Sequence, residues 1–129
     1  IYQVENGLIT SMTFVFPDGP LTDAESIVQE QLEAYNERDI AAFMDTYAQN
    51  IAVFEFPKTA SVIGKSKVEQ QYRLFFENTE DLHAEINNRI VIGNKVIDEE
   101  HVVANGKEFK AIAIYEVENG EIAKVTFIK

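Results

Sequence analysis

Apolar residues recur at helical spacing in three segments of the first half of the chain. They are Ile27, Val28, Leu32 and Tyr35 in residues 22–37; Ile40, Phe43, Met44 and Tyr47 in residues 39–47; and Val68, Tyr72, Phe75 and Phe76 in residues 66–76. Thr22, Asp39 and Ser66 stand where a polar side chain can accept a hydrogen bond from the first turn of a helix. The pattern therefore predicts three helices, the first two forming a short antiparallel pair.

The remaining apolar positions are typical of strands. Residues 51–57, IAVFEFP, predict one strand that Pro57 ends, because proline donates no hydrogen bond to a sheet. From His83 onward, four strands are separated by Gly93-Asn94, Asn105-Gly106 and Asn119-Gly120, dipeptides that tolerate the positive φ angles of tight turns. Three helices followed by an antiparallel meander predict an α+β fold, with the helices on one face of a strongly bent, mainly antiparallel sheet.

Alternation along the strands predicts which side chains face the helices. The inward set is apolar in the last two strands and consists of Phe109, Ala111, Ala113, Tyr115 and Val117, then Ala123, Val125 and Phe127. Between Val96 and Ala104 neither alternating set is cleanly apolar, because Asp98 and Glu100 share a face with Val96 and Val102. Charged groups must then approach a buried region, and such a conflict is typical of a functional site.

The N-terminal segment repeats the C-terminal one. Residues 1–16, IYQVENGLITSMTFVF, match nine of sixteen positions of residues 114–129, IYEVENGEIAKVTFIK. We expect a hairpin at 1–16, either an added strand pair or the remnant of a preceding domain copy, then a Pro/Gly-rich linker at 17–21 and one domain at 22–129. Ile1 in the place of an initiator Met favours a segment of a longer protein.

Composition narrows the classes of partner. The 129 residues are 46% hydrophobic, enough for one core, and the formal charge of −11 repels nucleic acid and anionic membranes, so neither is an expected partner. The chain has no cysteine, which excludes disulfides, thiol nucleophiles and zinc–thiolate sites. With no signal-like or bilayer-length apolar run, cytoplasmic localisation is the expectation.

The order of several short motifs carries a family resemblance over most of residues 21–129. They are RDIAAF at 38–43, Tyr47-Ala48, the strand ending at Pro57, Gly64-Lys65 before a helix, and YEVENGEIAKVTF at 115–127. This order resembles the nuclear-transport-factor-2-like superfamily, in particular its SnoaL-like branch, related to polyketide cyclases and ketosteroid isomerases. The resemblance implies a cone-shaped domain, with a curved sheet wrapped around three helices and a deep, largely apolar pocket. Members include enzymes, transport factors and non-catalytic ligand binders, so the fold sets no single function.

The chain departs from the ketosteroid-isomerase site, which needs a carboxylate base, a phenol and a protonated acid. The resemblance places the base position at Phe56, with Glu55 adjacent but of opposite parity. The phenol position falls near Gln31, with Tyr35 one turn later, and the acid position falls within residues 109–112, which contain no acid. Ketosteroid isomerisation is therefore not expected.

The same placement directs Asp98 and Glu100 into the pocket, as candidate catalytic residues. Carboxyl groups in an apolar cavity are suited to acid/base work near neutral pH. Alternatively, they pair with a cation across the sheet, Arg89 being the obvious partner. His83 and His101 could relay protons, although a histidine on a strand more commonly lies at the surface or at the rim of a pocket. They could also join the two carboxylates around a metal ion, but their spacing fits no strong ligand motif. We therefore expect neither a metal nor a cofactor.

Six aromatic side chains are the candidate ligand-binding residues implied by the resemblance: Tyr35, Phe54, Phe56, Tyr72, Tyr115 and Phe127. Plain core packing is the alternative for Phe54, whereas the phenols of Tyr72 and Tyr115 could orient a carbonyl ligand. Two functions remain open. One is non-catalytic, either binding of an apolar small molecule or simply the role of an oligomeric accessory domain. The other is a lyase, isomerase or cyclase acting by proton transfer on an apolar carbonyl compound, with Asp98, Glu100 and a tyrosine at its centre.

The outer face of the meander predicts self-association. Ile112, Ile114 and Ile128 are apolar residues on a nominally solvent-facing surface. Such residues suggest burial against a partner, so we expect a homodimer.

Overall fold

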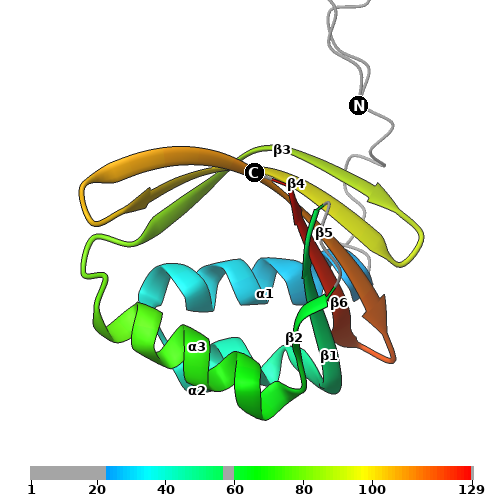
Figure 1. Cartoon of the computed structure of the whole chain (residues 1–129). Coiled ribbons are helices and arrows are strands. Elements are labelled where there is room, and N and C mark those ends of the chain that lie inside the picture. The colour runs from blue at the N-terminus through cyan, green and yellow to red at the C-terminus, as the bar shows by residue number, and fades with distance from the viewer. Residues whose placement is uncertain (1–22, 57–59, 129) are drawn as a thin grey trace, which may run out of the picture.

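Three helices pack against the concave face of one curved six-stranded sheet (Figure 1). The computed structural model describes residues 23–56 and 60–128. The elements are α1 (Asp23–Glu37), α2 (Ile40–Asp45), β1 (Tyr47–Glu55), β2 (Ala60–Ile63), α3 (Lys65–Glu77), β3 (His83–Ile92), β4 (Lys95–Ala104), β5 (Lys107–Glu118) and β6 (Glu121–Ile128). The α+β fold expected from the sequence is confirmed. The expected hairpin 1–16, the linker 17–21 and the cap at Thr22 lie outside the described residues.

The strand order in the sheet is β2-β1-β6-β5-β4-β3. Neighbouring strands are antiparallel except β1 and β6, which are parallel, so the sheet is mixed. The four-stranded meander β3 to β6 was expected, whereas β2 was not. It is a short edge strand that pairs with β1 through Val53 and Val62.

The structure corrects the boundaries of the second helix and the first strand. Asp39 caps α2 as expected, because its Oδ1 accepts a hydrogen bond from the Ala42 amide at 3.1 Å. The helix does not reach Tyr47, however. Thr46 ends it by donating from its hydroxyl to the Phe43 carbonyl at 2.7 Å, and Tyr47 is the first residue of β1.

The third helix begins differently from the expectation. Its N-cap is Gly64 rather than Ser66, and no side chain caps it. Gly64 has a φ of 99°, a conformation that residues with a Cβ rarely adopt, and its amide donates to the Ile51 carbonyl at 2.8 Å. The backbone turn between β2 and α3 therefore sets the start of the helix, in place of the expected capping box.

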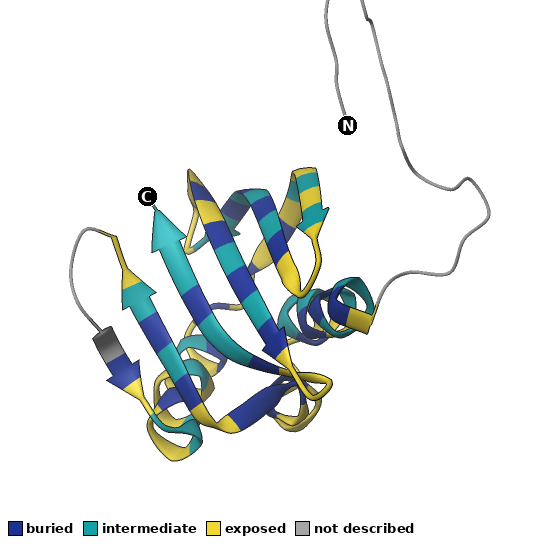
Figure 2. Ribbon diagram, turned by 90° about the vertical axis from the view of Figure 1, so that its right-hand side faces the viewer, coloured by how far each residue is buried: buried dark blue, intermediate teal, exposed yellow. Residues whose placement is uncertain are grey.

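Burial alternates along the central strands, as Figure 2 shows for the sheet. The inward set of β5 is confirmed, because Ala111, Ala113, Tyr115 and Val117 are buried. In β6 the expected phase holds for Val125 but fails at the start of the strand, where Ile122 is buried and Ala123 only partly so. A register shift causes the difference, because Val117 pairs with Ile122 while Glu116 pairs with Lys124, leaving Ala123 as an extra residue.

None of the helices in residues 23–56 and 60–128 is long and apolar enough to cross a membrane.

Candidate functional site

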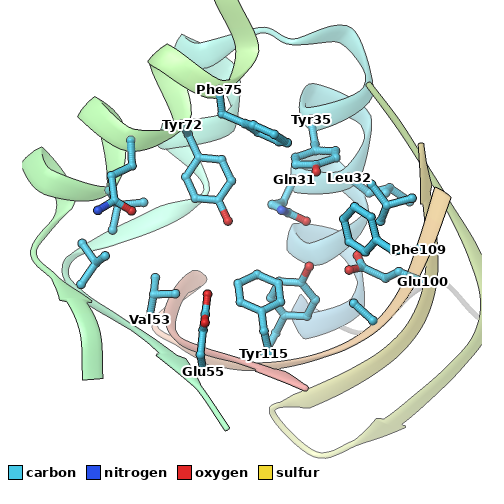
Figure 3. Close-up of a pocket in the computed structure, with 16 residues that line it drawn as sticks. Gln31, Leu32, Tyr35, Val53, Glu55, Tyr72, Phe75, Glu100, Phe109 and Tyr115 are labelled. Atoms are coloured by element: carbon cyan, nitrogen blue, oxygen red, sulfur yellow. The ribbon is translucent and has the colours of Figure 1, made fainter. Parts of the chain in front are cut away.

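A cavity of about 270 Å³ lies between the helices and the concave face of the sheet (Figure 3). Its wall is largely aromatic and aliphatic. The aromatic members are Tyr35, Tyr72, Phe75, Phe109, Tyr115 and Phe127, and the polar members besides the phenols are Gln31, Glu55, Gln71 and Glu100. Glu55, Gln71 and Phe109 are exposed to solvent, so they mark the mouth of the cavity.

Glu100 is the carboxylate at the interior end of this cavity. Its side chain is on the inward face of β4, and the residue is only 8% exposed. It pairs in register with Ala111 of β5, which also lines the cavity. Figure 3 shows its carboxylate directed into the cavity.

The phenols around Glu100 stay protonated. Burial, and to a smaller extent the negative charge of Glu100, raise the pKa of each of the four tyrosines that the structure describes: Tyr35, Tyr47, Tyr72 and Tyr115. For Tyr72, the charge of Glu55 adds to the effect of Glu100. The hydroxyl of Tyr72 therefore lies within the influence of both cavity carboxylates and remains a hydrogen-bond donor at neutral pH.

Gln31 connects the cavity to the core beneath it. The residue is 6% exposed, and its Nε2 donates to the hydroxyl of Tyr47 at 3.2 Å. Tyr47 itself is 2% exposed and does not line the cavity. The hydrogen bond fixes the amide orientation of Gln31, so its other polar atom keeps a defined position in the wall.

An aromatic cluster supports the helical side of the cavity. The Tyr72 ring lies 4.7 Å from that of Phe43 and 6.5 Å from that of Phe75, while Tyr35 and Phe75 are 6.4 Å apart, all measured between ring centroids. Phe43 is fully buried. Because each lining ring packs on other rings, this wall is preorganised.

Glu55 is a cavity residue that sequence reasoning did not identify. The resemblance placed the pocket position at Phe56, but Phe56 is 66% exposed, and Glu55 lines the cavity with Val53. The signal was present in the alternation of Ile51, Val53 and Glu55, since Ile51 is fully buried and the three share one face of β1. Applying strand parity to β1, as was done for β4, would have found it.

Asp98 does not line the cavity, although its side chain is on the same face of β4 as Glu100. It is 1% exposed and accepts two hydrogen bonds from Arg89, from Nε at 2.7 Å and from Nη2 at 3.0 Å. Arg89 also donates to Gln29 of α1 at 2.9 Å. The two carboxylates expected to act together therefore differ in surroundings, Asp98 in an ion pair under α1 and Glu100 in the cavity wall.

Of the other candidate residues, some line the cavity and the rest lie elsewhere. Tyr35, Tyr72, Tyr115 and Phe127 line the cavity, whereas Phe54 lies on the outer face of β1 with the Lys124 ammonium 4.9 Å from its ring. Neither histidine lines the cavity. His83 is exposed, and His101 Nε2 lies 3.3 Å from Glu108 Oε1. Within the described part of the chain, no three His, Asp or Glu side chains are grouped so that they could hold a metal ion.

The SnoaL-like domain family matches residues 28–125, so the chain belongs to this family. Comparison with curated protein sequences finds no match.

Solved structures share the fold at low sequence identity. A cystatin-fold protein from Novosphingobium aromaticivorans superposes with a TM-score of 0.76 at 21% identity, covering 85% of this chain and 100% of that one. An NTF2-like protein of unknown function from Cytophaga hutchinsonii superposes with a TM-score of 0.71 at 19% identity, and the match covers 85% of this chain and 91% of that one. An LEH-like epoxide hydrolase from M. tuberculosis superposes with a TM-score of 0.72 at 14% identity, and the match covers 82% of this chain and 81% of that one. At these identities the likeness establishes the fold, and function must be argued from the cavity.

Proposed function

We propose that the cavity binds a small, largely apolar molecule. The observation that carries the proposal is an interior space of about 270 Å³ lined by six aromatic side chains and only a few convergent polar groups. Ligand sites in proteins have this composition, and their volumes begin at about 300 Å³. A space just below that range suits a small ligand of about one to three rings.

The polar groups give such a ligand an orientation. Tyr72 presents a protonated hydroxyl inside the cavity, and Glu100 presents a carboxylate on the opposite, sheet side (Figure 3). A ligand with one polar end and an apolar body can satisfy these groups while its body displaces water from the rings.

Proton transfer within the same cavity is a second candidate function. The observation that favours it is that Tyr72, Glu55 and Glu100 line the same cavity (Figure 3). In an isomerisation, a carboxylate would take a proton from the carbon beside a carbonyl group and return it to another carbon of the ligand. The phenol would donate a hydrogen bond to the carbonyl oxygen as negative charge develops there. In this candidate function we propose Glu100 or Glu55 for the role of the carboxylate, in place of Asp98, because both line the cavity and Asp98 does not.

The experiment that tests binding uses N-phenyl-1-naphthylamine, a neutral apolar dye whose fluorescence rises in apolar surroundings. We expect saturable binding to the wild-type protein. Ala111→Leu places extra carbon atoms inside the cavity, because Ala111 is buried in its wall, and should weaken dye binding by about tenfold or more. Ala52→Leu adds the same atoms to β1, opposite Lys124 and away from the cavity wall, and is the matched control. The proposal is wrong if the wild type does not bind the dye or if Ala111→Leu binds it as well as the control does.

A further inference from the structure

Among the described residues that line the cavity, the charged ones are all acidic. Two of its residues, Glu55 and Glu100, are acidic, while none of the lining residues that the structure describes is Lys, Arg or His. The two carboxylates occupy different depths, since Glu55 is exposed at the mouth and Glu100 is 8% exposed. The charge thus continues from the entrance into the interior.

From this arrangement we infer that the ligand is an organic cation, an amine whose ammonium group lies beside Glu100 and whose apolar body lies among the rings. The inference rests on the proposed binding function and specifies the chemical class of the ligand.

The rings around Glu100 suit a positive charge. Tyr35, Tyr72 and Tyr115 all line the cavity with Glu100, and the charge of Glu100 acts on each of their phenols. The face of an aromatic ring carries partial negative charge and attracts an ammonium group placed over it. A carboxylate combined with several aromatic rings therefore favours a cation in two independent ways.

Desolvation explains why a cationic ligand fits this cavity better than an anionic one. An ammonium group that leaves water needs an opposite charge nearby, and Glu100 supplies one inside the protein. A ligand carboxylate or phosphate would instead bring its own negative charge next to that of Glu100. The formal charge of −11 on the whole chain has the same sign, and it raises the local concentration of cations near the mouth.

The test compares two molecules of the same shape. Benzyltrimethylammonium carries a permanent positive charge, and neopentylbenzene replaces its nitrogen with carbon. Binding of both to the full chain is measured by the shifts of protein NMR signals. We expect the cation to bind at least about tenfold more tightly at low salt, and the difference to narrow as ionic strength rises.

Two substitutions test whether Glu100 causes the preference for the cation. Glu100→Gln should remove most of the preference for the cation and leave binding of neopentylbenzene unchanged or stronger. Glu99→Gln is the matched control, because Glu99 is the next residue of β4, faces the other side of the sheet and carries the same charge. It should keep the preference. A preference that survives Glu100→Gln would overturn the inference.

The two probes remain decisive on the wild-type protein even if Glu100→Gln does not fold. Neopentylbenzene binding as tightly as benzyltrimethylammonium would overturn the cation inference and leave the proposed binding function intact. Failure of both probes, together with failure of N-phenyl-1-naphthylamine, would overturn the binding function as well.

Discussion

Arg89 holds Asp98 through both carboxylate oxygens, with Nε donating to Oδ1 at 2.7 Å and Nη2 to Oδ2 at 3.0 Å. The Asp98 side chain is 1% exposed and that of Arg89 is 14% exposed, so the pair is largely shielded from water. Such a bidentate contact fixes both side chains across β3 and β4. The carboxylate that looked most like a catalytic group in the sequence is thereby committed to an ion pair.

Asp98→Asn should therefore lower the free energy of unfolding by about 2–4 kcal/mol, because it leaves the Arg89 guanidinium without its nearest counter-charge. Urea denaturation at neutral pH measures the change. Glu99→Gln, on the outer face of the same strand, should change the stability by less than about 0.5 kcal/mol. Unchanged stability of Asp98→Asn would show that the ion pair contributes nothing, and would make Asp98 a candidate acid again.

The tyrosines predict the behaviour of the protein in alkali. Burial raises the pKa of Tyr35, Tyr47, Tyr72 and Tyr115 above the usual value of 10.0. Because the folded pKa exceeds the unfolded one, their contribution to stability is complete below about pH 10 and is lost as the pH rises toward the folded value. Absorbance at 295 nm should show these four phenols ionising only together with unfolding, in a Tyr2→Phe variant that removes the fifth tyrosine. Stepwise ionisation in the folded state would contradict this.

Asp81 predicts a loss of stability in acid. Its two carboxylate oxygens accept hydrogen bonds from the amides of Asn105 and Gly106, at 2.6 and 2.7 Å, in the turn between β4 and β5. These hydrogen bonds lower the pKa of Asp81 below its usual value of 3.8. The contribution to stability is therefore present above about pH 4 and disappears as the pH falls through the lowered value. Asp81→Asn should be less stable than wild type at pH 7, and the difference should shrink toward pH 2. Glu80→Gln, at the exposed neighbouring residue, should show no such convergence.

We propose that the expected homodimer forms through the outer face of the sheet. Cross-strand pairing places Ile90, Ile97 and Ile114 in one row over β3, β4 and β5, and Ile90 is 49% exposed. An apolar row of this kind on a solvent-facing sheet is suited to packing against a second copy. Ile114→Lys should convert a dimer to a monomer in sedimentation at tens of micromolar, while Glu121→Lys, an exposed residue at the start of β6, should not. A monomeric wild-type protein would count against the homodimer.

Removal of residues 1–18 should leave a folded domain that still binds the neutral dye. The helices, the sheet and the cavity all lie within the described residues from Asp23 onward. Circular dichroism and dye titration of the shortened chain test this expectation. Unfolding or aggregation would show that the N-terminal segment is an integral part of the fold.

Local patterns predicted most of the architecture, because the helices and the meander carry strong periodicity and clear turn residues. The four-residue β2 was missed because so short a strand has almost no pattern of its own and depends on pairing with β1. The sequence pattern placed Tyr47 in a helix because its spacing of four residues from Phe43 fits a helix as well as a strand that follows the helix. The hydrogen bond from the Thr46 hydroxyl to the Phe43 carbonyl ends the helix before Tyr47.

The candidate site was predicted only in part. Alternation in β4 correctly placed Asp98 and Glu100 on the inward face, since both are buried. Their separate surroundings depend on Arg89, which reaches Asp98 from β3, and on the small side chain of Ala111 beside Glu100. Sequence reasoning left the Arg89 pairing open as an alternative, and nothing in local sequence could decide which carboxylate the guanidinium would choose.

The position of β6 has a consequence for how the chain folds. This last strand lies in the middle of the sheet, where it joins β1 by parallel pairing to β5, so without residues 121–128 the sheet consists of two separate pieces. Contact between β1 and β6 closes a loop that contains most of the described chain. Because closing a long loop costs conformational entropy, we expect this contact to form late and slowly during folding. During synthesis, the β1–β2 hairpin and the β3–β5 meander therefore remain two separate pieces until residues 121–128 have emerged from the ribosome and joined them.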